Sequence, residues 1–402
     1  MVEYQEYAAL QASADSDKRA QAARIVARAY LEHDGPQSEH AALYAGLLSY
    51  LDDPSVRVRA ALAYELLHAS DAPRPIMFAL AQDAPIIASA VLQYSPVLTD
   101  TDLMFVIKQA DDELVHAAAR REKLSRRVVG ALIERQERAI DLMIVRKQHS
   151  DIADYQLLEL SERWTEDAVF RGLLLDRDDL PAVARYLLAE KVSEELAELR
   201  MVKGSIAPGR LKRFMRDLMD DAKAALAEFE LDEGQEQFLD VLIDSGRVNT
   251  RLMLHTLVSG RVLVFVALVS RMSGVSRRRV ASVLESGGRH SLNALLAKCS
   301  FVPAMRNVLI RIILNARHVD LAHDLAGRHG LVAGIIEELI VEHEGDVPED
   351  LRAVFSYLNE QNVTLARKAA RGVMRSFIDQ GGSDRSMQLS SLRDHRRALP
   401  AA

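Results

Sequence analysis

A short unit recurs along the first half of the chain, and it limits what the chain can fold into. An acidic or polar turn precedes a run of apolar and small residues, and the equivalent positions Val56, Ile87, Val115, Ile140 and Val169 lie 31, 28, 25 and 29 residues apart. A single short helical hairpin cannot bury its apolar face alone, whereas stacked hairpins bury one continuous core. The repeat therefore predicts an all-α array of helical hairpins.

The clearest copy of the unit is residues 51–67, LDDPSVRVRAALAYELL. Its aspartates and proline suit the start of a helix, because they satisfy or tolerate the free amides at its positive end. Ala60 and Ala61 are small enough to let neighbouring helices approach closely. We find no convincing alternating strands elsewhere. Since the repeat is shorter than the roughly 40 residues of a HEAT unit, we expect short helices and irregular repeats.

The repeat becomes faint in the second half of the chain. Residues 203–209 contain two glycines and a proline, a composition that favours a linker. We therefore expect a HEAT-like helical repeat domain over 1–202 and a second all-helical domain, or a continuation of the array, over 210–380. The polar and basic tail at 381–402 is predicted to be disordered.

Several stretches carry a family resemblance. The turn and first residues of the 51–67 copy resemble the second helix of HEAT repeats. Residues 79–83 (ALAQD), 91–103 (VLQYSPVLTDTDL) and 117–129 (AAARREKLSRRVV) resemble an alphaproteobacterial family of HEAT-like proteins, domain of unknown function 2336. The resemblance is clear over the first third of the chain, extends to about Cys299 and is absent beyond. It implies an α-solenoid and no settled activity, so no functional residue follows from it.

Composition bounds the class of protein. The one cysteine, Cys299, excludes a disulfide or a thiolate zinc site within one chain. The first ten residues, MVEYQEYAAL, lack the basic and apolar regions of a signal peptide. The most apolar run, 262–269, is far shorter than the ~20 residues of a membrane span. We expect a soluble cytoplasmic protein without a transmembrane segment.

Charge is distributed very unevenly in the second half. Residues 245–319 hold 12 Lys/Arg and a single acid, whereas residues 217–244 hold 10 acids and one Lys, in a chain of net charge −7. One interpretation is an anion-recognition surface suited to phosphate, an acidic partner, nucleic acid or an anionic lipid headgroup. Its candidate residues are Arg247, Arg251, Arg261, Arg271, Arg277, Arg278, Arg279 and Arg289. The alternative is that the acidic helices pack beside the basic ones, so that the charges pair or face water. Few aromatic residues accompany the arginines, which argues against single-stranded nucleic acid.

A second basic cluster lies within residues 120–147, where acids are interleaved. Solvated helix faces account for such a pattern.

No catalytic or metal-binding constellation is evident. His318 and His323 are five residues apart, which is not the spacing that places two ligands on one helix face. Cys299 lies on an apolar helix and fits a buried thiol better than a nucleophile. Trp164 with Asp167 resembles the residue types that HEAT-like DNA glycosylases use, but no further aromatic set accompanies it. We therefore expect no cofactor, no metal and no enzymatic activity.

Two functions fit these observations. The first is a non-enzymatic α-solenoid adaptor that binds another protein, in bacterial signalling or regulation. The second is an anion or nucleic-acid binder that uses the basic segment 245–319.

Overall fold

The computed structural model describes residues 4–147 and 150–380, and these contain 23 helices and no strand. The expected all-α class is confirmed. The chain divides into two compact units, residues 1–191 and 192–402, and the division falls inside α13 (Ala182–Glu198). Residues 381–402, expected to form a disordered tail, lie outside the described part.

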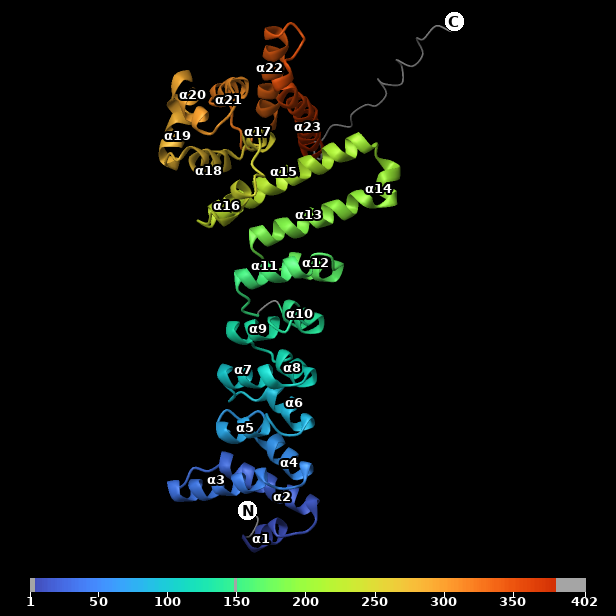
Figure 1. Cartoon of the computed structure of the whole chain (residues 1–402), viewed down its shortest axis with the longest axis vertical. Helices are drawn as coiled ribbons and strands as arrows, with labels where there is room; N and C mark the ends of the chain where they lie inside the picture. Colours follow the sequence, from blue (N-terminus) through green and yellow to red (C-terminus); the bar gives the residue numbers. More distant parts are fainter. Residues whose placement is uncertain (1–3, 148–149, 381–402) are drawn as a thin grey trace. The chain divides into compact units, whose positions relative to one another are not determined.

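The first unit is a stack of short helical hairpins, visible in Figure 1 from α2 to α12. Helices α2, α4, α6, α8, α10 and α12 pack one on the next, while α3 packs on α5 and α7 on α9. This layering is consistent with the expected α-solenoid. The helices are α1 (Tyr4–Gln11), α2 (Ser16–Leu31), α3 (Gln37–Leu51), α4 (Val56–Leu66), α5 (Arg74–Leu80), α6 (Pro85–Tyr94), α7 (Asp100–Gln109), α8 (Asp112–Ala119), α9 (Arg126–Ile133), α10 (Arg138–Val145), α11 (Asp154–Arg163) and α12 (Ala168–Leu175).

The five positions that defined the repeat all fall in second helices of the hairpins. Ile87, Val115 and Ile140 are buried. Val56 and Val169 are instead 41% and 50% exposed, and the core positions of their helices are Val58 and Phe170. The assigned register was therefore wrong by one or two residues at both ends of the repeat.

The acidic turns have two roles. Asp167 caps α12 by accepting hydrogen bonds from the amides of Val169 and Phe170, as expected for a helix start. The same carboxylate also pairs with Arg138 of the preceding hairpin at 2.7 Å. Equivalent pairs join neighbouring hairpins along the unit: Arg19–Asp53, Arg59–Asp83 and Arg74–Asp102.

A second set of basic residues caps the C-terminal ends of helices by donating hydrogen bonds to their last carbonyls. Arg121 follows α8 and donates to the carbonyls of Leu92 and Ser95, at the end of α6. Lys147 follows α10 and donates to the carbonyl of Ala119 at 2.6 Å, at the end of α8. Arg177 follows α12 and donates in the same way to residues 145 and 147 at the end of α10. A cation is favourable there, because the last carbonyls of a helix lack partners and carry negative partial charge. For Arg121 and Lys147, the interpretation as solvated helix faces is therefore wrong.

The second unit is built around α17, whose residues 252–258 are all buried. It packs on α15, α18, α21 and α23. The helices are α14 (Arg200–Ser205), α15 (Pro208–Asp232), α16 (Gln237–Asp244), α17 (Thr250–Val258), α18 (Val262–Ser273), α19 (Arg277–Ser286), α20 (Arg289–Lys298), α21 (Pro303–Ala316), α22 (Leu325–Glu342) and α23 (Glu349–Gln380).

Two sequence features of the second unit have a local explanation. Of residues 203–209, expected as a linker, 203–205 end α14, 206 and 207 form the break between the helices, and Pro208 occupies a first-turn position of α15 that suits proline. Gly260, after α17, has a φ of +84°, and a Cβ there would lie 2.0 Å from the carbonyl oxygen of Leu321. Only glycine fits this close approach of two backbone segments.

The apolar run at 262–269 lies in α18, and residues 264–269 are buried in the protein. Among the described residues, no helix is long and apolar enough to cross a membrane.

Candidate functional site

The predicted arginines of the basic segment do not share one environment. Arg251 is the most enclosed: it pairs with Asp217 and Asp220 of α15 and with Glu360 of α23. Its guanidinium also lies 4.8 Å from the centre of the Tyr357 ring. A cation held by three carboxylates and an aromatic face joins three helices and is not available to an external anion.

Three further arginines face acids of α15, of α16 and of the N-cap position before α16. Arg261 pairs with Glu228, and Arg271 pairs with Glu236 at 2.8 Å and with Asp240 at 3.2 Å. Arg277 pairs with Glu236 at 2.6 Å. These contacts match the alternative in which acidic and basic helices pack together. Arg247 lies half-buried in the turn between α16 and α17, while Arg278, Arg279 and Arg289 are exposed.

A buried polar chain extends the Arg251 cluster. His255 of α17 bonds through Nε2 to Asp221 at 2.8 Å and through Nδ1 to the hydroxyl of Tyr357 at 3.1 Å. Burial raises the pKa of Tyr357 well above its usual value, which keeps the phenol protonated. Burial also raises the pKa of Asp217, although Arg251 opposes this shift. Because Tyr357 and His255 are buried, these bonds hold α15, α17 and α23 together.

A groove lies beside this cluster, between α15 and α23. It has a volume of about 710 Å³. Its lining combines apolar side chains, arginines and small polar groups: Arg210, Arg213, Phe214, Asp217, Arg352, Phe355, Ser356, Asn359, Glu360, Val363, Thr364 and Arg367. Both acids in this set are already bound to Arg251. We name this feature the α15–α23 groove.

A smaller basic pocket lies between α20 and α21, with a volume of about 400 Å³. It is lined by Arg289, His290, Asn293, Pro303, Arg306, Asn307, Ile310 and Arg311, a set without a carboxylate. Of the eight predicted arginines, Arg289 is the one that lines it. We name this feature the α20–α21 pocket.

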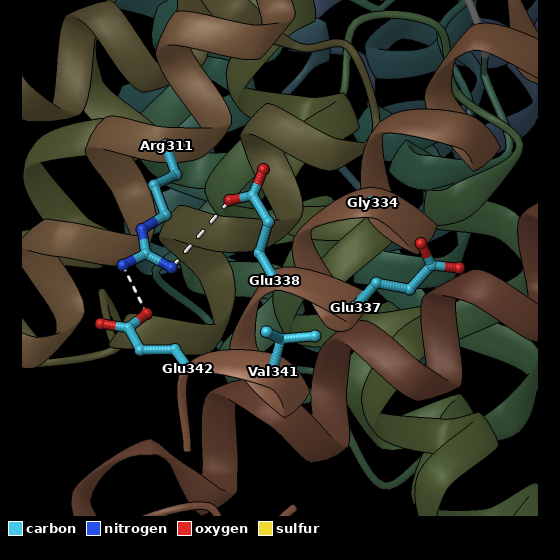
Figure 2. Close-up of a pocket in the computed structure, with 6 residues that line it drawn as sticks. All are labelled: Arg311, Gly334, Glu337, Glu338, Val341 and Glu342. Carbon is cyan, nitrogen blue, oxygen red and sulfur yellow. Dashed lines mark ion pairs between the residues drawn. The ribbon is translucent and has the colours of Figure 1, made fainter. Parts of the chain in front are cut away.

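An acidic pocket of about 560 Å³ lies on the other side of Arg311, against α22. Figure 2 shows the Arg311 guanidinium between Glu338 and Glu342, which it approaches at 4.0 Å and 2.5 Å. Glu337 and Val341 line the same pocket. Arg311 therefore belongs to both pockets, and these glutamates fix its position.

Most of these lining residues were not among the residues predicted from the sequence. Arg210 and Arg213 precede a run rich in acids, and Arg352 and Arg367 lie beyond the segment in which basic residues dominate. A signal was present in α23, where positions 352, 355, 356, 359 and 363 repeat at the three- and four-residue spacing of one helix face. That spacing predicts that these side chains share one face of the helix, but it does not predict that α15 packs beside this face.

The other candidate residues have ordinary structural settings. Trp164 donates to Asp141 at 2.8 Å and stacks on Phe170. Burial raises the pKa of the Cys299 thiol to about 11, so little thiolate forms at neutral pH. In the part of the chain that the structure describes, no group of three or more His, Cys, Asp or Glu residues could hold a metal ion.

Comparison with known proteins gives one match. Residues 87–320 match the model of a family described as an uncharacterised protein conserved in bacteria (DUF2336). The match covers more than half of the chain and includes helices of both units. No curated protein and no solved structure matches the chain.

Proposed function

The chain belongs to the DUF2336 family of uncharacterised bacterial proteins, and we propose that it is a non-enzymatic helical adaptor. Its partner is an acidic, amphipathic helical segment of another protein, in bacterial signalling or regulation. The α15–α23 groove carries this proposal, because it combines exposed apolar side chains with arginines whose charge the groove's own acids do not offset.

The apolar part of the groove provides the contact area. Phe214 is 59% exposed and Val363 is 50% exposed, while Phe355 is half-buried. Fully burying a large apolar side chain contributes roughly 1.5–3 kcal/mol, so covering the exposed half of each of these would contribute about half of that. A groove between two helices, with apolar residues on both sides, suits a third helix laid along it.

The charge of the groove selects the partner. Arg210, Arg213, Arg352 and Arg367 all line it. Of the two acids, Asp217 and Glu360, each is bound to Arg251, and Glu360 approaches Arg213 only at 4.0 Å. A bound helix with acids beside its apolar stripe would complement this lining, whereas a basic helix would be repelled.

Site-specific photo-crosslinking in the native bacterium tests the proposal. A photoreactive phenylalanine analogue replaces Phe214 or Val363 in the full-length chain, and a matched control replaces Leu263, which is 61% exposed on α18. We expect the same partner segment, rich in Asp and Glu, to be crosslinked from both groove positions and not from the control.

The crosslinked segment is then synthesised and titrated into the full-length protein. Phe214→Ala and Arg213→Glu should each weaken its binding at least tenfold, and Arg278→Glu, a charge reversal on α19, should not. Equal crosslinking at Leu263, or a segment without acidic character, would contradict the proposal.

A further inference from the structure

The α20–α21 pocket gathers arginines and hydrogen-bonding side chains from two helices that pack on each other. Arg289, His290 and Asn293 come from the first turns of α20, and Arg306 and Asn307 come from α21. Residues 303, 306, 307 and 310 follow the three- and four-residue spacing of one helix face, so α21 presents a continuous wall to the pocket.

No acidic residue of the pocket lining neutralises the positive charge of its arginines. Its lining contains three arginines and no carboxylate. The structure records no ion pair for Arg289 or His290 among the residues it describes. Arg311 is the exception, since Glu342 holds it from the other side (Figure 2). The pocket therefore keeps a net positive charge.

Two local features increase the attraction for an anion. The first turn of α20 contains no acid, and the Arg289 guanidinium lies there, at the positive end of the helix, where a cation is unfavourable. Arg306 has one carbonyl partner, Phe301 at 3.4 Å, and its Nε atom is buried without an acceptor. An anion bound in the pocket would neutralise the unfavourable positive charge at the start of α20. Its oxygens would also accept hydrogen bonds from guanidinium donors that have no partner.

We infer that the α20–α21 pocket binds the phosphate group of a compact phosphorylated metabolite. Its volume of about 400 Å³ is typical of a small-molecule site. Guanidinium and carboxamide groups from two helices present donors in several directions, an arrangement that matches the oxygens of a phosphate better than a single carboxylate. The lining offers no aromatic side chain other than His290 on which bases could stack, so a nucleic acid strand is a poorer ligand.

Isothermal titration of the full-length protein at low salt tests this inference. The probes are inorganic phosphate, pyrophosphate, AMP and a single-stranded oligonucleotide. We expect saturable binding of at least one of the three small phosphates. Arg289→Ala and Arg306→Ala should each weaken binding about tenfold or more, as expected for the loss of a charge-assisted hydrogen bond.

Two further variants test the geometry. Glu342→Gln removes a carboxylate that holds Arg311 and should strengthen binding. Arg278→Ala, which removes an exposed arginine of the neighbouring α19, should leave it unchanged. Circular dichroism of each variant verifies the fold. If Arg306→Ala does not fold, the exposed Arg289→Ala and the phosphate-dependent shift of the His290 ring signals in the wild type decide the outcome.

The inference would be overturned by the absence of saturable binding for all three small phosphates. It would also be overturned if Arg278→Ala weakened binding as much as Arg289→Ala, since attraction would then be a property of the whole surface. Binding of the oligonucleotide alone, with a steep dependence on salt, would assign the arginines to nucleic acid instead.

Discussion

Replacing Arg121 with methionine should destabilise the first unit measurably, although the residue lies in a turn between helices. Its two terminal nitrogens donate to the carbonyls of Leu92 and Ser95 at 2.6 Å and 2.7 Å. Both accepting residues are fully buried, so water cannot easily replace the lost donors. Methionine keeps most of the apolar stem and removes the guanidinium.

The magnitude follows from these contacts. Hydrogen bonds to a charged group contribute ~1.5–3 kcal/mol each, and the variant loses two of them. Part of this loss is recovered, because a half-buried guanidinium no longer has to be desolvated, and burial already lowers the pKa of Arg121. We expect the free energy of unfolding to fall by about 2 kcal/mol. With a urea dependence of about 2 kcal/mol per M, the unfolding midpoint should fall by about 1 M.

Urea unfolding followed by tryptophan fluorescence provides the assay. Trp164 is the only tryptophan of the chain, and it stacks on Phe170 within the first unit, so it reports on that unit. The matched control is Arg120→Met, which removes the same charge from the neighbouring exposed position and should change stability by less than ~0.5 kcal/mol. If Arg121→Met shifts the midpoint no more than Arg120→Met does, the contacts with the two carbonyls contribute nothing to stability and the prediction is refuted.

Three other predictions concern pH, backbone geometry and thiol chemistry. The hydrogen bond from Arg74 lowers the pKa of Asp102, so the stabilisation by this carboxylate is present above the unfolded pKa of about 3.9 and is lost as pH falls through the lower folded value. The difference in unfolding free energy between wild type and Asp102→Asn should therefore become smaller below about pH 4. A difference that stays constant from pH 7 to pH 2 would contradict this. Gly260→Ala should cost about 3 kcal/mol in thermal or urea unfolding because its Cβ would meet a carbonyl oxygen at 2.0 Å, whereas Gly246→Ala, with a similar positive φ and open space, should cost only about 1 kcal/mol. Because its pKa is raised to about 11, the folded protein's Cys299 should react with a disulfide reagent at pH 8 about 100-fold more slowly than a free thiol, and unfolding should restore the faster rate. Rapid labelling of the folded protein would contradict this by showing that the thiol is accessible.

The helical class and the repeat could be predicted because both are encoded locally. Apolar spacing, small residues and acidic turns all lie within one hairpin, and together they were sufficient to locate the second helices. The register was not predicted at both ends of the repeat, because nearby positions there are also apolar: Val58 is close to Val56, and Phe170 follows Val169. Which of these neighbours enters the core is decided by packing against the next hairpin, and this information is not local.

The candidate sites were predicted less well for the same reason. The opposed charges of 217–244 and 245–319 were evident in the sequence, and the structure pairs four of the predicted arginines with acids, most of them in the acidic segment. The α15–α23 groove joins residues about 140 positions apart, such as Arg213 and Arg352. Composition cannot indicate such a juxtaposition, because it depends on how α15, α17 and α23 pack.

The cations that close helix ends also bear on how the first unit is made. Arg121 closes α6, Lys147 closes α8 and Arg177 closes α10, and in each case the donor lies about 26 to 32 residues after its acceptors. During synthesis on the ribosome, each hairpin is therefore finished only after the following one has emerged. Deleting one hairpin together with the turn after it would also delete the cation that caps the preceding hairpin. A module for deletion, duplication or engineering should therefore be chosen so that each hairpin keeps the cation that follows the next one.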